Sequence, residues 1–183
     1  HYNETSELSF DLPAFANGEA TPHYNDVVGM RLVDWIGVGQ FILVNPSVSN
    51  TGVKEIKSCK AYSLEYELTY KSTYMEEGTY ELWNPMAPDG TVLGMILSDY
   101  PSWRVGIVDA DLVGRYRTLE SDNQKTYDLM KNTLQKMYQC VFDFDTYKRE
   151  ISVRSVASKT RERPVYLSTD NLIKQIEVEE VTE

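Results

Sequence analysis

The sequence predicts an α+β fold, with a β-rich first part and a second part in which helices pack on antiparallel strands. One observation is a stripe of apolar residues at helical spacing in the second part. The stripe consists of Tyr127, Met130, Leu134, Met137 and Tyr138. Ser121, Asp122 and Asn123 come shortly before it and are good N-cap residues, so we expect the helix to begin next to them.

A second observation is that the hydrophobic period changes from helical to two directly after this stripe. Residues 140–145 form an alternating pattern, so Phe142 and Phe144 are expected to face a core and the aspartates to face solvent. A turn then leads to a second run, in which Ile151 and Val153 alternate. The helix and this hairpin are expected to form one packed unit.

The third observation is a series of strand patterns separated by turn signals in the first part of the chain. These patterns are Leu8–Leu12, Met30–Ile36, Gln40–Val44 and the long run 53–68. Gly37-Val38-Gly39 separates the second pattern from the third, which predicts a hairpin.

Between the two parts, Thr91–Leu97 has the pattern of a short helix that ends before Pro101. Either Asp89 or Thr91 can cap its N-terminus. Trp103–Val108 has a strand pattern, and a turn or short helix follows it before the long helix begins.

The last stretch of the chain again has extended patterns, at Val165–Leu167 and Ile173–Val178, and is expected to return to the first part. The predicted domains are therefore residues 1–77 together with 157–183, and residues 78–156. Strand patterns lie close to both ends of the chain, so we expect it to be a fragment of a longer protein.

The composition limits the classes of partner. The 183 residues carry a net charge of −10, which argues against binding to nucleic acid or to an anionic membrane. No apolar run approaches the length that spans a bilayer, and no signal-peptide pattern opens the chain. Cys59 and Cys140 lie in apolar strand patterns and are expected to be buried free thiols, with a disulfide as the alternative.

Asp143 and Asp145 are the sharpest candidates for catalysis. Two residues apart on a strand, they would share one face at roughly 7 Å, within the range of paired-carboxylate hydrolysis. The same alternation is also typical of a solvated strand face beside a turn, and this second interpretation is favoured.

The sequence contains no convincing metal, phosphate or nucleophile motif. His1 and His23 have no further ligand at metal-binding spacing. Asp99, Asp109 and Asp111 lack the glycine and distal glutamate of a calcium loop. We therefore predict no catalytic, metal-binding or cofactor-binding residues and no cofactor.

Two groups of residues could contact partners. The basic group is Lys148, Arg149, Arg154, Lys159, Arg161 and Arg163, which could bind an acidic patch of a neighbouring subunit or form a solvated strand edge. The aromatic group is Trp35, Trp83 and Trp103 with the tyrosines, which could line a sugar-binding surface. Such residues are more often core or interface anchors.

Several segments of the chain resemble the N-terminal region of siphophage and prophage tail proteins. The resemblance is clearest at Tyr127–Met130, Tyr138–Thr146 and Arg149–Val153. Further matching segments, in the same order along the chain, are Glu7–Pro13, Lys60–Leu68, Gly78–Tyr80, Leu93–Leu97 and Tyr116–Leu119. Members of this family are often labelled prophage endopeptidase tail or tail-associated lysin proteins, and they are similar to the baseplate hub of contractile phages.

The resemblance implies a small β-barrel-like module in the first part and an α+β module in the second. It implies a hub at the virion tail tip, or in the bacterial cytoplasm when expressed from a prophage, which closes the tail tube and connects to a lysin or receptor-binding part. The implied partners are two further copies in a homotrimer of the full-length protein, the distal tail protein, and the tape measure and tail tube proteins. No catalysis is expected in these residues. The alternatives are a carbohydrate-binding module that uses surface Trp and Tyr, or a cell-wall hydrolase that uses Asp143 and Asp145.

Overall fold

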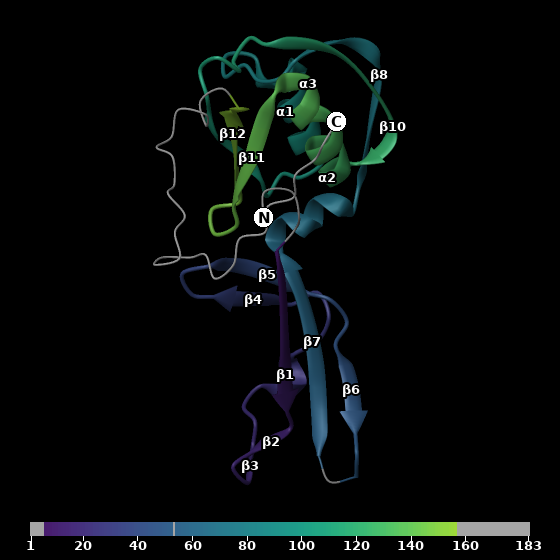
Figure 1. The fold of residues 1–183 in the computed structure, drawn as a ribbon, viewed down its shortest axis with the longest axis vertical. Coiled ribbons are helices and arrows are strands. Elements are labelled where there is room, and N and C mark those ends of the chain that lie inside the picture. Colours follow the sequence, from purple (N-terminus) through teal and green to yellow (C-terminus); the bar gives the residue numbers. More distant parts are fainter. Residues whose placement is uncertain (1–5, 53, 157–183) are drawn as a thin grey trace, which may run out of the picture.

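A sheet at one end of the molecule and a packed group of helices and strands at the other make up an elongated fold (Figure 1). The computed structural model describes residues 6–52 and 54–156. The sheet lies in the lower half of Figure 1, and the three described α-helices with the strands that follow residue 71 lie in the upper half. The predicted α+β class is confirmed, since most strands pair in antiparallel fashion and the helices are few and short.

The lower sheet is an antiparallel half-barrel of five strands. Its strands are β1 (Glu7–Pro13), β4 (Leu32–Trp35), β5 (Gly39–Leu43), β6 (Ser47–Asn50) and β7 (Glu55–Ser63). The central strand is β7, which pairs with β1 along most of its length, with β6 at one end and with β5 at the other. Among the described residues β4 pairs with β5 alone, so it forms an edge of the sheet. The predicted hairpin around Gly37-Val38-Gly39 is confirmed.

Short elements connect β1 to β4. They are a two-residue pair, β2 (Phe15–Ala16) with β3 (Glu19–Ala20), and one turn of 3-10 helix, η1 (Tyr24–Asp26). Within the sheet, Phe41 and Leu43 of β5 pack with Cys59 and Ala61 of β7. This small cluster forms the core of the half-barrel.

The predicted strand over residues 53–68 is too long. Strand β7 ends at Ser63, and the chain continues as a 3-10 helix, η2 (Leu64–Thr69), which leads into the upper half. Leu64 and Leu68 are fully buried there. Leucines four residues apart fit a helical face as well as an alternating strand, so the pattern could not distinguish the two.

The upper half contains two further sheets. A two-stranded ribbon is formed by β8 (Ser72–Glu81) and β10 (Tyr116–Lys125). A three-stranded sheet contains β9 (Arg104–Val108), β11 (Cys140–Asp145) and β12 (Glu150–Ser155), with β12 in the middle. Phe142, Ile151 and Val153 are buried and Phe144 is partly buried, so the predicted hairpin and its inward face are confirmed.

Helices cover these strands (Figure 1). The first are η3 (Pro88–Gly90) and α1 (Val92–Ser98), and Thr91 caps α1 as predicted, since its Oγ1 accepts a hydrogen bond from the Gly94 amide at 3.1 Å. The predicted long helix follows as α2 (Thr126–Asp128), the π-helical turn η4 (Leu129–Leu134) and α3 (Gln135–Tyr138).

The predicted apolar stripe is correct except at one position. Its first three members and Tyr138 are buried, whereas Met137 is 40% exposed. The π-helical turn contains more residues than an α-helical turn, so it rotates the residues that follow it about the helix axis. Leu129, which is not a member of the predicted stripe, is also buried.

The helix does not begin at residues 121–123, contrary to the prediction. Ser121, Asp122 and Asn123 belong to β10, and the helix starts at Thr126. The Ser121 hydroxyl is buried and donates to the carbonyl of Thr73 on β8 at 2.8 Å. Pairing with β8 therefore replaces the local capping that these side chains favour.

The predicted division into residues 1–77 with 157–183, and 78–156, remains a prediction. Strand β8 runs through position 77, and the upper hydrophobic core includes Leu64 and Leu68 from the first part. Residues 157–183 lie outside the described residues.

Both cysteines are buried free thiols, as predicted. Burial raises the pKa of the Cys59 thiol, and it raises that of Cys140 to about 12. Both thiols are therefore protonated and poorly nucleophilic at neutral pH. In the described ranges, no helix is long and apolar enough to cross a membrane.

Candidate functional site

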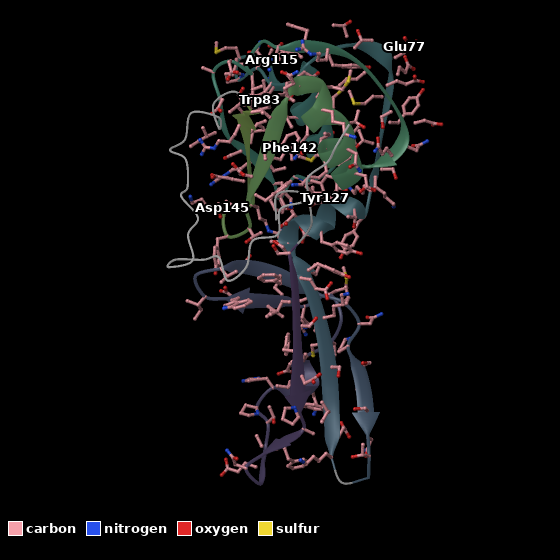
Figure 2. The ribbon with its side chains drawn as sticks, viewed as in Figure 1. Glu77, Trp83, Arg115, Tyr127, Phe142 and Asp145 are labelled. Atoms are coloured by element: carbon pink, nitrogen blue, oxygen red, sulfur yellow. The ribbon has the colours of Figure 1, made fainter. Side chains whose placement is uncertain are left out.

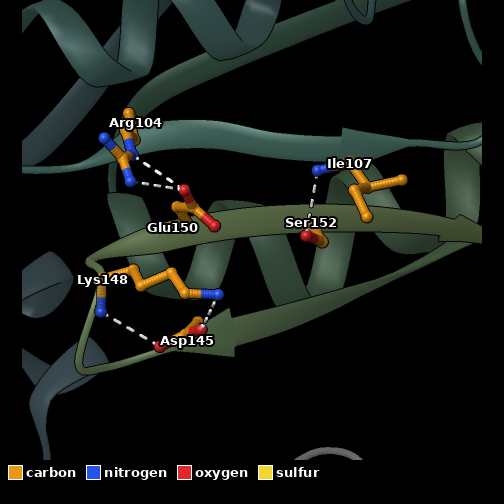
Figure 3. Close-up of polar contacts among 6 residues, drawn as sticks. All are labelled: Arg104, Ile107, Asp145, Lys148, Glu150 and Ser152. Atoms are coloured by element: carbon orange, nitrogen blue, oxygen red, sulfur yellow. Dashed lines mark hydrogen bonds and ion pairs between the residues drawn. The ribbon is translucent and has the colours of Figure 1, made fainter.

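Asp143 and Asp145 lie on the outward face of β11, where each carboxylate contacts a cation. Asp143 Oδ2 lies 3.4 Å from Arg154 Nε. Asp145 accepts a hydrogen bond from the Lys148 amide at 3.0 Å and lies 3.2 Å from Lys148 Nζ (Figure 3). The Lys148 amide, followed by its ammonium group, holds the pKa of Asp145 below its usual value. A glycosidase acid needs the opposite shift, so Asp145 is suited to closing the turn rather than to donating a proton.

We therefore expect the purified protein to release no muropeptides or sugars from cell walls. The variants Asp143→Asn and Asp145→Asn should give the same background as the unmodified chain, because both carboxylates serve as ion-pair partners. Chromatography of soluble products after incubation with peptidoglycan measures this. Release that either asparagine substitution abolishes would identify a hydrolase.

Among the described residues, no group of three or more His, Cys, Asp or Glu is placed to hold a metal ion. Two of the aspartates considered above, Asp109 and Asp111, have structural partners instead. Asp109 accepts a hydrogen bond from the Ser155 amide at 2.8 Å, and Asp111 pairs with Arg115 at 3.2 Å. His23 pairs with Asp26 at 2.9 Å on the surface, while His1 lies outside the described residues.

The described members of the basic group are paired with carboxylates of the same chain. Lys148 contacts Asp145, and Arg154 lies between Asp143 and Asp109. Arg149 Nη1 lies 2.7 Å from Glu67 Oε2, and the side chains of this pair are only 26% and 20% exposed. These three cations therefore hold elements of the fold together. Lys159, Arg161 and Arg163 lie outside the described residues.

The three tryptophans do not share one surface. Trp103 is buried in the upper core and its indole N–H donates to Glu67, while Trp83 is partly buried against the same core. Trp35 of β4 is 50% exposed. Figure 2 shows Trp83 in the upper half, whereas β4 lies at the level of the junction. The three tryptophans therefore do not form the continuous aromatic platform that a sugar-binding surface would use.

Exposed apolar side chains gather instead around β4. Trp35 lies at the end of β4, and Ile36, which is 89% exposed, and Val38 lie in the turn after it. Tyr147, in the turn between β11 and β12, donates from its hydroxyl to Asp34 Oδ1 at 3.0 Å and is within 2.9 Å of the Trp35 carbonyl. We call Trp35, Ile36, Val38 and Tyr147 the hairpin tip. Its hydrogen bonds hold it against the upper half, although its apolar groups face solvent.

A hollow of about 440 Å³ lies beside the other end of β4. Its apolar lining comes from Met30, Leu32, Ile42 and Tyr70, and its polar rim from Glu67, Lys71 and Arg149, with Tyr100 between them. Met30, Leu32 and Tyr70 are each about half exposed or more. We call this the β4 hollow. The sequence carried no clear signal for it, because apolar residues of both parities in Met30–Ile36 are equally typical of a strand that is buried on both faces.

No protein-family model matches the chain, and no curated protein sequence matches it either. Its fold, however, is similar to that of a prophage tail protein. The solved structure is prophage tail protein gp18 from Listeria monocytogenes, which matches with a TM-score of 0.59 and 17% sequence identity.

The match covers 84% of this chain and 42% of the Listeria chain, so this chain spans less than half the length of that protein. At this identity the comparison establishes the fold. The fold is consistent with the phage tail resemblance seen in the sequence segments, and that family, with its hub and lysin subgroup, remains a prediction.

Proposed function

We propose that the chain is a structural component of a phage or prophage tail, and that it belongs to the tail-tip hub. In this role it closes the tail tube and connects to a lysin or receptor-binding part, without catalysis in these residues. The observation that carries the proposal is the fold similarity to a prophage tail protein across 84% of this chain. The corresponding location is the virion tail tip, or the bacterial cytoplasm when a prophage expresses the protein.

The proposed assembly is a homotrimer of the full-length protein that contacts the distal tail protein and the tape measure and tail tube proteins. A closed ring needs heterologous contacts, in which one surface of each subunit meets a different surface of the next. The hairpin tip supports this proposal, because Trp35, Ile36 and Val38 are exposed apolar residues on a turn that hydrogen bonds hold in place. Apolar and aromatic side chains presented in this way are typical anchors of protein interfaces. We assign the hairpin tip to the contact between subunits.

Light scattering on residues 1–183 and on a chain extended at both termini tests this assembly. We expect the extended chain to form trimers, and residues 1–183 alone to be monomeric or weakly associated at the same concentration. In the extended chain, Ile36→Asp should shift the trimer toward the monomer. The matched control is Ile107→Asp on β9, because Ile107 is also an exposed isoleucine, at 63%, and lies outside the hairpin tip.

The hub proposal fails if the extended chain stays monomeric, including when its distal tail neighbour is present. If trimers form and both aspartate variants behave alike, the hub proposal stands and the assignment of the hairpin tip is wrong.

A further inference from the structure

The half-barrel and the upper half of the molecule meet at a narrow junction. Within the described ranges the chain passes between them once, where β7 ends at Ser63 and η2 begins at Leu64 (Figure 1). Each half has a hydrophobic core of its own, and Ile42 is the one buried residue of the described half-barrel strands that belongs to the upper core. Parts of a chain that share little apolar surface are expected to move relative to each other.

Hollows border this junction on both faces of β5. Ile42 lines the β4 hollow, together with Tyr70 and Tyr100 of the upper half. Phe41 precedes Ile42 in the strand and therefore lies on the opposite face, where it lines a second hollow of about 370 Å³ together with Phe142 of the upper half. Among the described residues, the contact between the halves thus lies between two hollows, and the half-barrel has space to turn.

The turn between β11 and β12 reaches across the junction. Thr146 Oγ1 accepts a hydrogen bond from the Gln40 amide at 2.9 Å. The Tyr147 hydroxyl donates to Asp34 Oδ1 at 3.0 Å, and the Trp35 carbonyl lies 2.9 Å from it. Two neighbouring residues of the upper half therefore hold both strands of the β4–β5 hairpin.

This turn is fixed on one side and closely seated on the other. The 2.7 Å ion pair between Arg149 and Glu67 joins it to η2. On the half-barrel side Thr146 lies against Gly39, where an added Cβ atom would be 2.8 Å from Thr146 Oγ1. A side chain at position 39 would therefore push the turn away from β5. The two halves are connected here by a short polar bridge.

We propose that the half-barrel turns as a rigid unit against the upper half, about the Ser63–Leu64 connection, and that Thr146 and Tyr147 form a latch that holds it in the orientation described above. When the latch opens, the Gln40 amide becomes solvated and Ile42 leaves the upper core. The equilibrium is then set by a few hydrogen bonds and one apolar side chain, while both cores stay folded.

Thiol labelling of the full chain with iodoacetamide tests the proposal, with Ile42→Cys as the reporter of the junction. The native cysteines serve as references, because Cys59 is buried in the half-barrel core and Cys140 in the upper core. Loss of one hydrogen bond shifts such an equilibrium several-fold. We therefore expect Thr146→Val/Tyr147→Phe to accelerate labelling at position 42 at least tenfold, and Cys59 and Cys140 to keep their rates. Mass spectrometry of peptides separates the three sites.

The matched control is Thr79→Val/Tyr74→Phe on β8, which removes the same two kinds of hydroxyl group from exposed positions of the upper half. It should leave all three rates unchanged. If the double latch variant does not fold, Tyr147→Phe alone takes its place, with a smaller acceleration expected because the Thr146 hydrogen bond remains.

Unchanged labelling at position 42, or equal acceleration in the control, overturns the proposal. Equal acceleration of Cys59 or Cys140 also overturns it, because the turn would then stabilise that core instead of holding the two halves together. None of these readouts requires the tail-tip function, so the two proposals can fail separately.

Discussion

Replacement of Phe142 by alanine is expected to lower the free energy of unfolding by about 3–5 kcal/mol. Phe142 is 2% exposed and belongs to the upper core, together with Tyr127, Met130 and Leu134 of the long helix. Figure 2 places Phe142 on β11 within this half of the molecule. Truncation removes most of a buried ring and leaves a cavity between the strand and the helix, and both effects destabilise the fold.

Chemical denaturation followed by circular dichroism measures this loss. The control is Ile107→Ala on β9, a residue of the same sheet that is 63% exposed, and its effect should stay within about 0.5 kcal/mol. Phe144→Ala should fall between the two, because Phe144 is partly buried and its ring contacts those of Trp103 and Tyr127, with centroids 6.1 Å away in both cases. A loss below about 1 kcal/mol for Phe142→Ala would contradict the inward orientation of this residue.

Arg149→Met is expected to cost about 2–3 kcal/mol of stability. Arg149 and Trp103 both donate to Glu67 Oε2, at 2.7 Å and 3.1 Å. One carboxylate of η2 therefore connects the residue that precedes β9 with the β11–β12 turn. Removing one partner of a fully buried ion pair costs about 3–5 kcal/mol, because the remaining charge is unpaired. We expect less here, since both side chains retain some contact with water.

A double-mutant cycle with Glu67→Gln isolates this interaction, because it subtracts what each side chain does separately. The comparison is Lys60→Met, which breaks the exposed pair between Lys60 and Glu7, where the side chains are 46% and 43% exposed. That change should cost below about 1 kcal/mol. Equal losses for the two methionine variants would mean that the Arg149–Glu67 pair contributes no more than a surface pair.

Cell-wall hydrolysis by Asp143 and Asp145 is the alternative that the structure makes least attractive. The sequence pattern places the two residues on one strand face, and the structure agrees. Their contacts with Arg154 and Lys148 come from residues on the facing strand and in the connecting turn. Both candidate catalytic carboxylates are therefore ion-paired with cations of the same hairpin.

The sequence by itself determined the elements whose residues interact over a short range. The period-two pattern around Phe142 and the turn after it predicted the β11–β12 hairpin, and four members of the helical stripe are buried as expected. The N-cap at Thr91 was also predicted correctly, because its hydrogen bond joins residues only three positions apart. Burial of Cys59 and Cys140 also followed from their apolar neighbours.

The tertiary structure decided which distant segments meet. Ser121 carries an N-cap side chain, yet it lies in β10 because Thr73 of β8 is available as a partner 48 residues away. Arg149 was one of a group of basic residues in the sequence, and its partner Glu67 is 82 residues away. Whether β4 is central or at an edge depends on how the half-barrel is arranged, since the same apolar run would suit either position. Local periodicity indicates the face of a helix or strand on which a residue lies. What that face contacts is determined by long-range pairing, which depends on the geometry of the whole chain.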